Sequence, residues 1–166
     1  DGEVGNVTLS LFMISENDNF ADRASLSGTF ALTSGVTDFA THEISEPIHA
    51  GNVGGRSIWW EWTAPSDGRV DIDTTVSDFD TLLAIYTGDT LGGLTEVASN
   101  DDVGGDITGS FISTPVFGGT TYKIAVDGKN LNGELSQGTV LLTLEFSPAP
   151  SNDNFADALD LVGTDA

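Results

Sequence analysis

Acidic and amide side chains flank two short apolar runs, and their types and spacing suit the binding of a metal ion. The runs 81–87 and 94–99 are joined by a glycine-containing connection, which predicts a β-hairpin in which Thr81 faces Asn100. This pairing brings the loop before the first strand beside the loop after the second strand. The oxygen-bearing residues expected at that end are Asp78, Asp80, Asn100, Asp101 and Asp102.

These oxygen ligands favour Ca²⁺, which takes six to eight oxygen atoms in proteins, with backbone carbonyls or water completing the shell. Mg²⁺ suits such a set less well because it demands stricter octahedral geometry. The spacing differs from that of the EF-hand loop. The alternative interpretation is that these residues end strands and cap turns, a common use of Asp and Asn. We expect a calcium site here, whose removal by a chelator lowers the melting temperature.

The charge balance also favours a protein that binds cations. Five Lys and Arg stand against twenty-six Asp and Glu, which gives a formal net charge of -21. Such a surface repels nucleic acid and anionic membranes, and its self-repulsion lowers stability unless cations neutralise it. The alternative is an acidic solvation shell with no bound ion. No apolar run approaches the roughly 18 residues of a membrane helix, so we expect no membrane insertion.

Catalytic chemistry has little support in the sequence. The chain has no cysteine, which excludes disulfides, thiolate metal sites and a cysteine nucleophile. His42 and His49 are the only histidines, and their spacing predicts neither a zinc centre nor a catalytic triad. His49 lies in a glycine-containing loop and is expected to form hydrogen bonds there. Asp71 and Asp73 alternate with apolar residues, which indicates a solvated strand face rather than a glycosidase pair. We expect no enzymatic activity.

The apolar residues alternate in short runs bounded by Gly, Asn, Asp and Ser, which predicts antiparallel strands. The chain is therefore expected to be all-β, an antiparallel β-sandwich or jelly roll of about eight strands. A helical turn is expected only near residues 17–24. Trp60 and Trp62 share the expected core face of one strand, whereas Trp59 lies on the opposite face and is the candidate contact for a ligand or partner. The expected strands are 27–33, 56–63, 68–75, 81–87, 94–99, 107–113, 120–127 and 138–146.

An internal repeat divides the chain. The hexapeptide NDNFAD occurs at residues 17–22 and again, unchanged, at 152–157. We therefore expect 1–14 to be the last strand of a preceding copy or an assembly strand, and 15–147 to be a complete domain. Residues 148–166 are expected to hold a proline-containing linker and the start of a following copy.

The ordered motifs NDNFADR, EPIHAGNVGGRSIWWEWTAP, DFDTLLAIYTG, VASNDD and GTTYKIAVDG together resemble bacterial pre-peptidase C-terminal domains over nearly all of 15–147. This resemblance implies a jelly-roll sandwich that occurs as an accessory or repeated unit in secreted and surface proteins, including beside proteases and collagenases. In the collagenase relatives, an Asn-Asp segment that leads into the domain helps to bind calcium, and Asn17 and Asp18 match that segment. The second acidic segment is not reproduced, because Gly-Gly-Arg-Ser precedes Ile58. Glu46 is our candidate replacement.

Two functions follow as expectations. The first is a secreted, calcium-stabilised repeat module with a structural or adhesive role, whose partners are neighbouring copies of the same domain arranged head to tail as arrays or filaments. An unpaired strand at 4–14 could complete a neighbouring subunit. The second is an accessory module that holds a secreted enzyme on extracellular polysaccharide or protein fibres.

Overall fold

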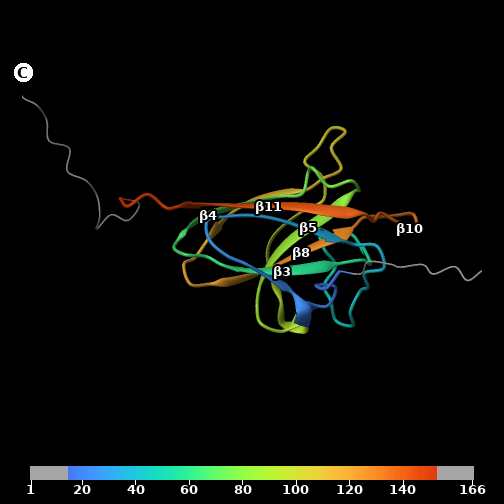
Figure 1. The fold of residues 1–166 in the computed structure, drawn as a ribbon, viewed down its shortest axis with the longest axis horizontal. Helices are drawn as coiled ribbons and strands as arrows, with labels where there is room; N and C mark the ends of the chain where they lie inside the picture. Colours follow the sequence, from blue (N-terminus) through green and yellow to red (C-terminus); the bar gives the residue numbers. More distant parts are fainter. Residues whose placement is uncertain (1–14, 153–166) are drawn as a thin grey trace, which may run out of the picture.

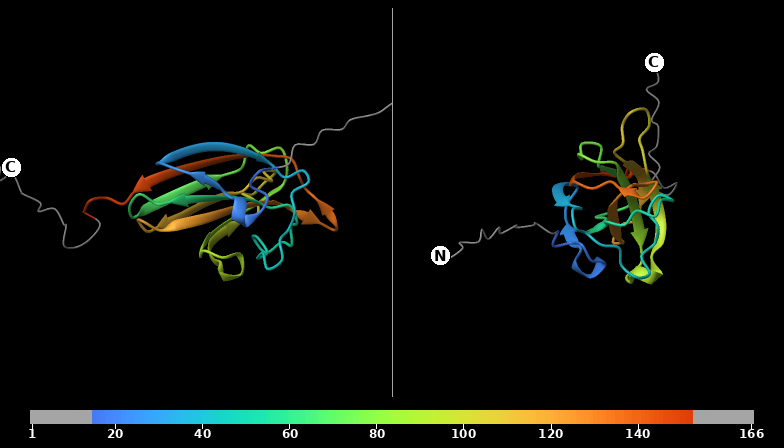
Figure 2. Two further views of the ribbon diagram at one scale, coloured as in Figure 1. Left: turned by 60° about the horizontal axis from the view of Figure 1, so that its bottom comes forward. Right: turned by 90° about the vertical axis from the view of Figure 1, so that its right-hand side faces the viewer.

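The computed structural model describes residues 15–152, and these form a two-layered β-sandwich with two single 3-10 turns (Figures 1 and 2). No helix in this part of the chain is long and apolar enough to cross a membrane. The 3-10 turns are η1 (Phe20–Asp22) and η2 (Leu91–Gly93). The strands are β1 (Ala24–Leu26), β2 (Phe30–Val36), β3 (Ile58–Thr63), β4 (Gly68–Asp73), β5 (Thr81–Thr87), β6 (Thr95–Asn100), β7 (Phe111–Val116), β8 (Thr121–Gly128), β9 (Asn130–Leu131), β10 (Glu134–Leu135) and β11 (Thr139–Pro148).

The strands form two main sheets that pack face to face. Sheet A has the order β1-β3-β8-β5-β6, and sheet B has the order β2-β11-β4-β7. All pairs are antiparallel except β1 with β3, and β9 and β10 form a separate two-stranded ribbon. The longest strand, β11, runs along the long axis of the molecule (Figure 1). The predicted fold class is confirmed.

The core between the sheets comes from the alternating apolar residues that the sequence predicts. Val140, Leu142 and Leu144 of β11 are fully buried, and they meet Trp60 and Trp62 from the opposite sheet in one cluster. Trp62 also donates its indole N–H to the carbonyl of Gly28 at 2.9 Å, so its polar atom is satisfied. The expected inward orientation of Trp60 and Trp62 is confirmed.

The prediction that Trp59 is an exposed ligand contact is wrong. Trp59 is 0% exposed, and it packs on the outer face of sheet A with Phe20, Tyr86 and Ala125. The loop between β2 and β3 and the turn η1 cover this face, so the strands at the centre of sheet A are buried on both sides. The sequence indicates this burial through the continuous apolar run 82–86 in β5, because a strand that is buried on both faces does not alternate apolar and polar residues.

The predicted strands match the structure except at their ends. The largest difference is β7, which begins at Phe111 instead of 107, because residues 103–109 form a loop closed by a bridge between Gly104 and Ile107. The predicted helical turn is present as η1. Strand β11 continues to Pro148, one residue past the expected domain end. The expected strand at 4–14 and the following copy lie outside the described residues.

Candidate metal centre

The β5–β6 hairpin exists, but its register differs from the prediction. Leu83, not Thr81, pairs with Asn100, because β6 holds one extra residue at a bulge and the hairpin turn is longer than expected. Thr81 instead pairs with Gly128 of β8. The predicted pairing of Thr81 with Asn100 is therefore wrong, and Asp80 faces the end of β8 as well as the end of β6.

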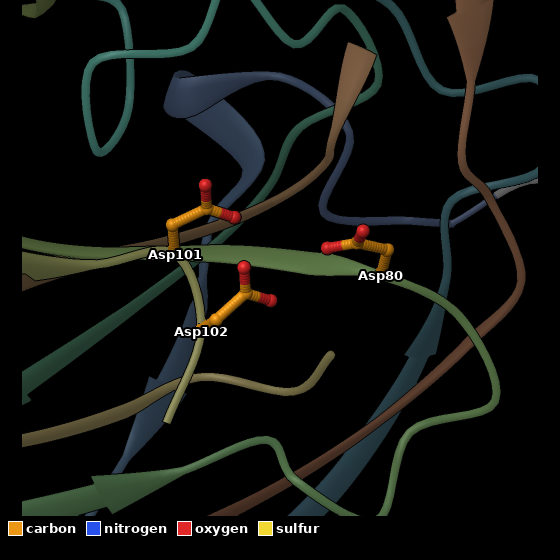
Figure 3. A group of neighbouring side chains, drawn as sticks. All are labelled: Asp80, Asp101 and Asp102. Carbon is orange, nitrogen blue, oxygen red and sulfur yellow. The ribbon is translucent and has the colours of Figure 1, made fainter. Parts of the chain in front are cut away.

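Three of the predicted ligands nevertheless come together. Asp80 precedes β5, and Asp101 and Asp102 follow β6, so they share one end of neighbouring strands. One carboxylate oxygen from each residue lies within 4.8 Å of one from each of the other two, and Figure 3 shows the three side chains facing a common space. We call these three residues the acidic cluster. The backbone of Asp80 is fixed on both sides, because its N–H donates to Ser136 and its carbonyl accepts from the N–H of Lys129.

Lys129 is the residue of this site that the sequence analysis missed. Its ammonium lies 2.9 Å from Asp101 Oδ2, 2.8 Å from Asp102 Oδ2 and 3.9 Å from Asp80 Oδ2. These carboxylates raise the pKa of Lys129 well above its ordinary value, chiefly through the hydrogen bonds with Asp102 and Asp101. Its position in the sequence could have indicated this role, because Lys129 directly follows β8, the strand that pairs with β5. Lys129 neutralises one of three negative charges.

Two oxygens of the acidic cluster are buried and accept no hydrogen bond from the described residues, namely Asp80 Oδ1 and Asp101 Oδ1. Burial raises the pKa of Asp80, and the carboxylates of Asp102 and Asp101 add to that rise against the opposing charge of Lys129. A buried carboxylate oxygen without a donor is costly. All the side-chain ligands here are oxygen atoms, and the three carboxylates carry more negative charge than Lys129 neutralises. The acidic cluster therefore fits a hard cation such as Ca²⁺.

Asp78 and Asn100 each accept a backbone N–H from a neighbouring strand. Asp78 Oδ1 accepts the N–H of Thr139 at 2.7 Å and thereby fixes the start of β11. Asn100 Oδ1 accepts the N–H of Phe111 at 3.0 Å, while its amide donates to the carbonyl of Asp102. Asn100 thus joins the end of β6 to the start of β7. For these two residues, the turn-capping interpretation agrees with the contacts, and metal binding by them stays a prediction.

Asn17 and Asp18 hold the first described residues against the sandwich. Asn17 pairs with Trp59 twice, since its side-chain amide donates to the Trp59 carbonyl and its own carbonyl accepts the Trp59 N–H. Both carboxylate oxygens of Asp18 accept from Thr41, the shorter bond being 2.7 Å from the backbone N–H. A calcium-binding role for Asn17 and Asp18 stays a prediction, and it would compete with these bonds.

Glu46 belongs to a buried hydrogen-bonded chain. Glu46 Oε1 lies 3.0 Å from His49 Nε2, and His49 Nδ1 lies 2.8 Å from Tyr86 Oη. Burial acts to raise the pKa of Glu46, but hydrogen bonds with His49, Ser57 and the backbone of Glu43 outweigh it and lower the pKa. The expectation that His49 serves as a hydrogen-bonding residue is confirmed. Metal binding by Glu46 stays a prediction.

Asp127 is a second residue, after Lys129, that the sequence analysis did not single out. It is 1% exposed, and its oxygens accept the backbone N–H groups of Gly55, Arg56 and Gly128, at 2.8, 2.7 and 2.6 Å for the shortest bonds. Burial raises its pKa, and these hydrogen bonds oppose that rise. Asp127 therefore fixes the loop between β2 and β3 onto the end of β8.

Comparisons with known proteins return structural similarities only. No protein-family model matches the sequence, and no curated protein matches it. The pre-peptidase C-terminal domain of a collagenase from Bacillus anthracis superposes with a TM-score of 0.45 and 12% identity, covering 75% of this chain and 94% of that one. The CBM36-1 domain of a multidomain xylanase from the hindgut metagenome of Trinervitermes trinervoides superposes with a TM-score of 0.38 and 12% identity, covering 72% of this chain and 100% of that one. The chain is structurally similar to both β-sandwich domains.

Proposed function

We propose that the chain is a non-catalytic, extracellular β-sandwich module that is stabilised by Ca²⁺ at the acidic cluster and acts as a structural unit in a larger array. The observation that carries the calcium site is the pair of buried oxygens, Asp80 Oδ1 and Asp101 Oδ1, which lack a donor beside a third carboxylate. Bound Ca²⁺ would ligate Asp80, Asp101 and Asp102, neutralise their mutual repulsion and join the ends of β5 and β6.

The path of the chain supports a spacer role. Ser15 hydrogen-bonds to Val36 at the end of β2. The next residue, Thr37, donates its N–H to the carbonyl of Gly138, just before β11 begins, so Ser15 and the start of β11 lie at the same end of the sandwich. Strand β11 then carries the chain to the opposite end of the sandwich, about 30 Å away for a ten-residue strand. A module entered at one end and left at the other suits an in-line array. The net charge of -21 fits a cation-rich setting.

The alternative, an accessory module that binds polysaccharide or protein fibres, lost its candidate contact when Trp59 proved to be buried. The buried His49 chain offers no catalytic alternative, because a substrate could not reach a ring that is 1% exposed. The acidic cluster is therefore the best-supported functional site of the described residues.

Calcium is expected to raise the melting temperature. Extracellular modules bind Ca²⁺ with dissociation constants on the order of 0.1–1 mM. At 10 mM Ca²⁺ this gives about 1.4–2.7 kcal/mol of stabilisation, or roughly 3–10 °C for a domain of this size. Differential scanning calorimetry in 10 mM CaCl₂ and in EDTA measures the difference. The Asp80→Asn/Asp101→Asn double variant should lose it, whereas Asp106→Asn, on the same loop but outside the acidic cluster, should keep it. Equal melting of the wild-type chain in both buffers would contradict the proposal.

Lys129 is expected to compete with calcium. Replacing it with methionine keeps the apolar stem and removes the ammonium that lies among the three carboxylates. We expect Lys129→Met to melt at a lower temperature than wild type in EDTA, because the carboxylates lose their cation. Ca²⁺ should bind about tenfold more tightly, since the ion no longer displaces a positive charge. Isothermal titration calorimetry compares the two chains, and weaker binding by Lys129→Met would show that the ion does not occupy this space.

A further inference from the structure

Strand β2 forms an open edge of sheet B. It pairs with β11 on one side, and no other described strand pairs with it. The N–H of Val36 points away from β11 and donates to Ser15 Oγ at 3.0 Å, so the alternate residues Phe30, Leu32 and Ser34 direct their backbone groups to the same open side. Phe30 and Leu32 are 60% and 68% exposed.

The other three edges of the two main sheets are protected in ways that β2 is not. Strand β7 carries Pro115, and its first N–H is taken by Asn100. Strand β6 has a bulge and an exposed Glu96. Strand β1 is only three residues long, and Asn17 pairs with β3 beyond it. Bulges, charges, proline and short edge strands all prevent unwanted pairing between sheets. The seven residues of β2 have none of these features.

A groove lies beside this edge, between β2 and β1. Its volume is about 470 Å³, and its lining includes Ala24, Thr33, Gly35 and Trp60, with the acidic Glu16 and Asp22 from the segment before β1. The inward side of β2 carries small residues, and a Cβ at Gly35 would lie 2.5 Å from Ile58 Cδ1. A strand added to β2 would place every second side chain over this groove.

We propose that the open edge of β2 binds residues 4–14 of a second copy of this chain by β-strand addition. One face of an extended segment would carry only apolar residues, Val7, Leu9, Leu11 and Met13, whereas the other face would carry Asn6, Thr8, Ser10, Phe12 and Ile14. Neither residues 4–14 nor β2 contains a charged side chain, so the two can approach within a chain of net charge -21. Backbone hydrogen bonds to β2 give affinity, and the apolar side chains fill the groove.

The register favours a second copy over the same chain. Ser15 is fixed beside Val36 by two hydrogen bonds, so residues 8–14 of the same chain would run parallel to β2 with residue 14 beside Gly35 and residue 12 beside Thr33. That register turns two polar and two apolar residues toward the groove, Thr8, Ser10, Phe12 and Ile14, and it turns Leu9, Leu11 and Met13 toward solvent. A shift by one residue turns the wholly apolar face of Val7, Leu9, Leu11 and Met13 toward the groove, and only a segment from another molecule is free to make that shift.

Two variants of the full chain separate the donor from the acceptor. Leu11→Asp puts a charge in the segment that enters the groove, and Leu131→Asp is its control, since Leu131 is also exposed but lies on β9. Ser34→Pro removes one N–H on the open side of β2 and leaves the bonds to β11 in place. Melting temperatures within a few degrees of wild type would show that both variants fold.

Sedimentation velocity, over a hundredfold range of concentration, tests the proposal. Wild type and Leu131→Asp should form assemblies that grow with concentration, in EDTA as well as in Ca²⁺, because neither surface includes the acidic cluster. Leu11→Asp and Ser34→Pro should each be monomeric, and their equimolar mixture should form dimers, because each supplies the half that the other lacks. A monomeric wild type, unchanged assembly of Leu11→Asp, or a mixture that stays monomeric would overturn the proposal. Loss of the calcium effect alone would leave it intact.

Discussion

Replacing Trp59 with alanine is expected to lower the free energy of unfolding by about 3–5 kcal/mol, the range for large aromatic residues in cores. The ring is fully buried against Phe20, at a centroid distance of 5.2 Å, and against His49, at 5.4 Å. Its loss opens a cavity between sheet A and the segments that cover its outer face. Urea denaturation followed by circular dichroism measures the change.

Trp59→Phe is the matched control. The indole Nε1 is buried and has no hydrogen-bond partner among the described residues, so phenylalanine removes volume without breaking a bond. We expect this variant to lose less than half of the alanine effect. If Trp59→Ala changed the unfolding free energy by less than about 1 kcal/mol, the burial of this face of sheet A would be contradicted.

Replacing Asp127 with alanine is expected to cost about 2–4 kcal/mol, because it leaves the buried N–H of Gly128 and the partly buried N–H groups of Gly55 and Arg56 without an acceptor. The loss should appear mainly in the loop between β2 and β3, which Asp127 fixes to β8. Hydrogen exchange should therefore show faster exchange at the amides of Gly55 and Arg56. Unchanged protection of these amides would mean that Asp127 does not hold the loop.

A pair of glycine variants tests the same contact without changing the carboxylate. A Cβ at Gly54 would lie 1.8 Å from Asp127 Oδ2, whereas a Cβ at Gly51 meets nothing within 4 Å. Both residues have positive φ, +48° and +75°, so both alanine variants carry backbone strain of about 1 kcal/mol. Gly54→Ala should cost clearly more than Gly51→Ala in the same denaturation experiment. Equal costs would show that the approach to Asp127 adds nothing.

The strands and the sheet faces could be predicted because they follow from local alternation. The run 140–146 shows this, since Val140, Leu142 and Leu144 all face the core as their spacing indicates. Trp59 could not be placed by the same rule, because its burial depends on a covering segment, η1, from a distant part of the sequence. Alternation identifies the two faces of a strand, but it does not say whether the second face is covered.

The candidate site was predicted in part for similar reasons. Asp80, Asp101 and Asp102 were placed near one another because the hairpin fixes which loops meet. Asp78 and Asn100 were included on the same argument, but each accepts a backbone N–H from a neighbouring strand, Thr139 for one and Phe111 for the other. Hairpin geometry brings loops together, but it does not show which side-chain oxygens already accept a backbone N–H from a strand that is distant in sequence.

Because Lys129 lies among the three carboxylates, calcium binding at the acidic cluster is a competition between two cations. The ammonium satisfies Asp102 and one oxygen of Asp101, but it leaves Asp80 Oδ1 and Asp101 Oδ1 without a partner. A divalent ion can contact all three carboxylates at once, which a single ammonium at 3.9 Å from Asp80 does not achieve. Stabilisation by calcium therefore requires Lys129 to move.

The most direct test is a crystal structure determined with 10 mM CaCl₂ in the crystals. The calcium-binding hypothesis predicts an ion at about 2.3–2.6 Å from carboxylate oxygens of Asp80, Asp101 and Asp102, with the Lys129 ammonium turned away from them. A well-ordered map in which Lys129 still contacts Asp101 and Asp102 and no ion lies between the carboxylates would contradict it.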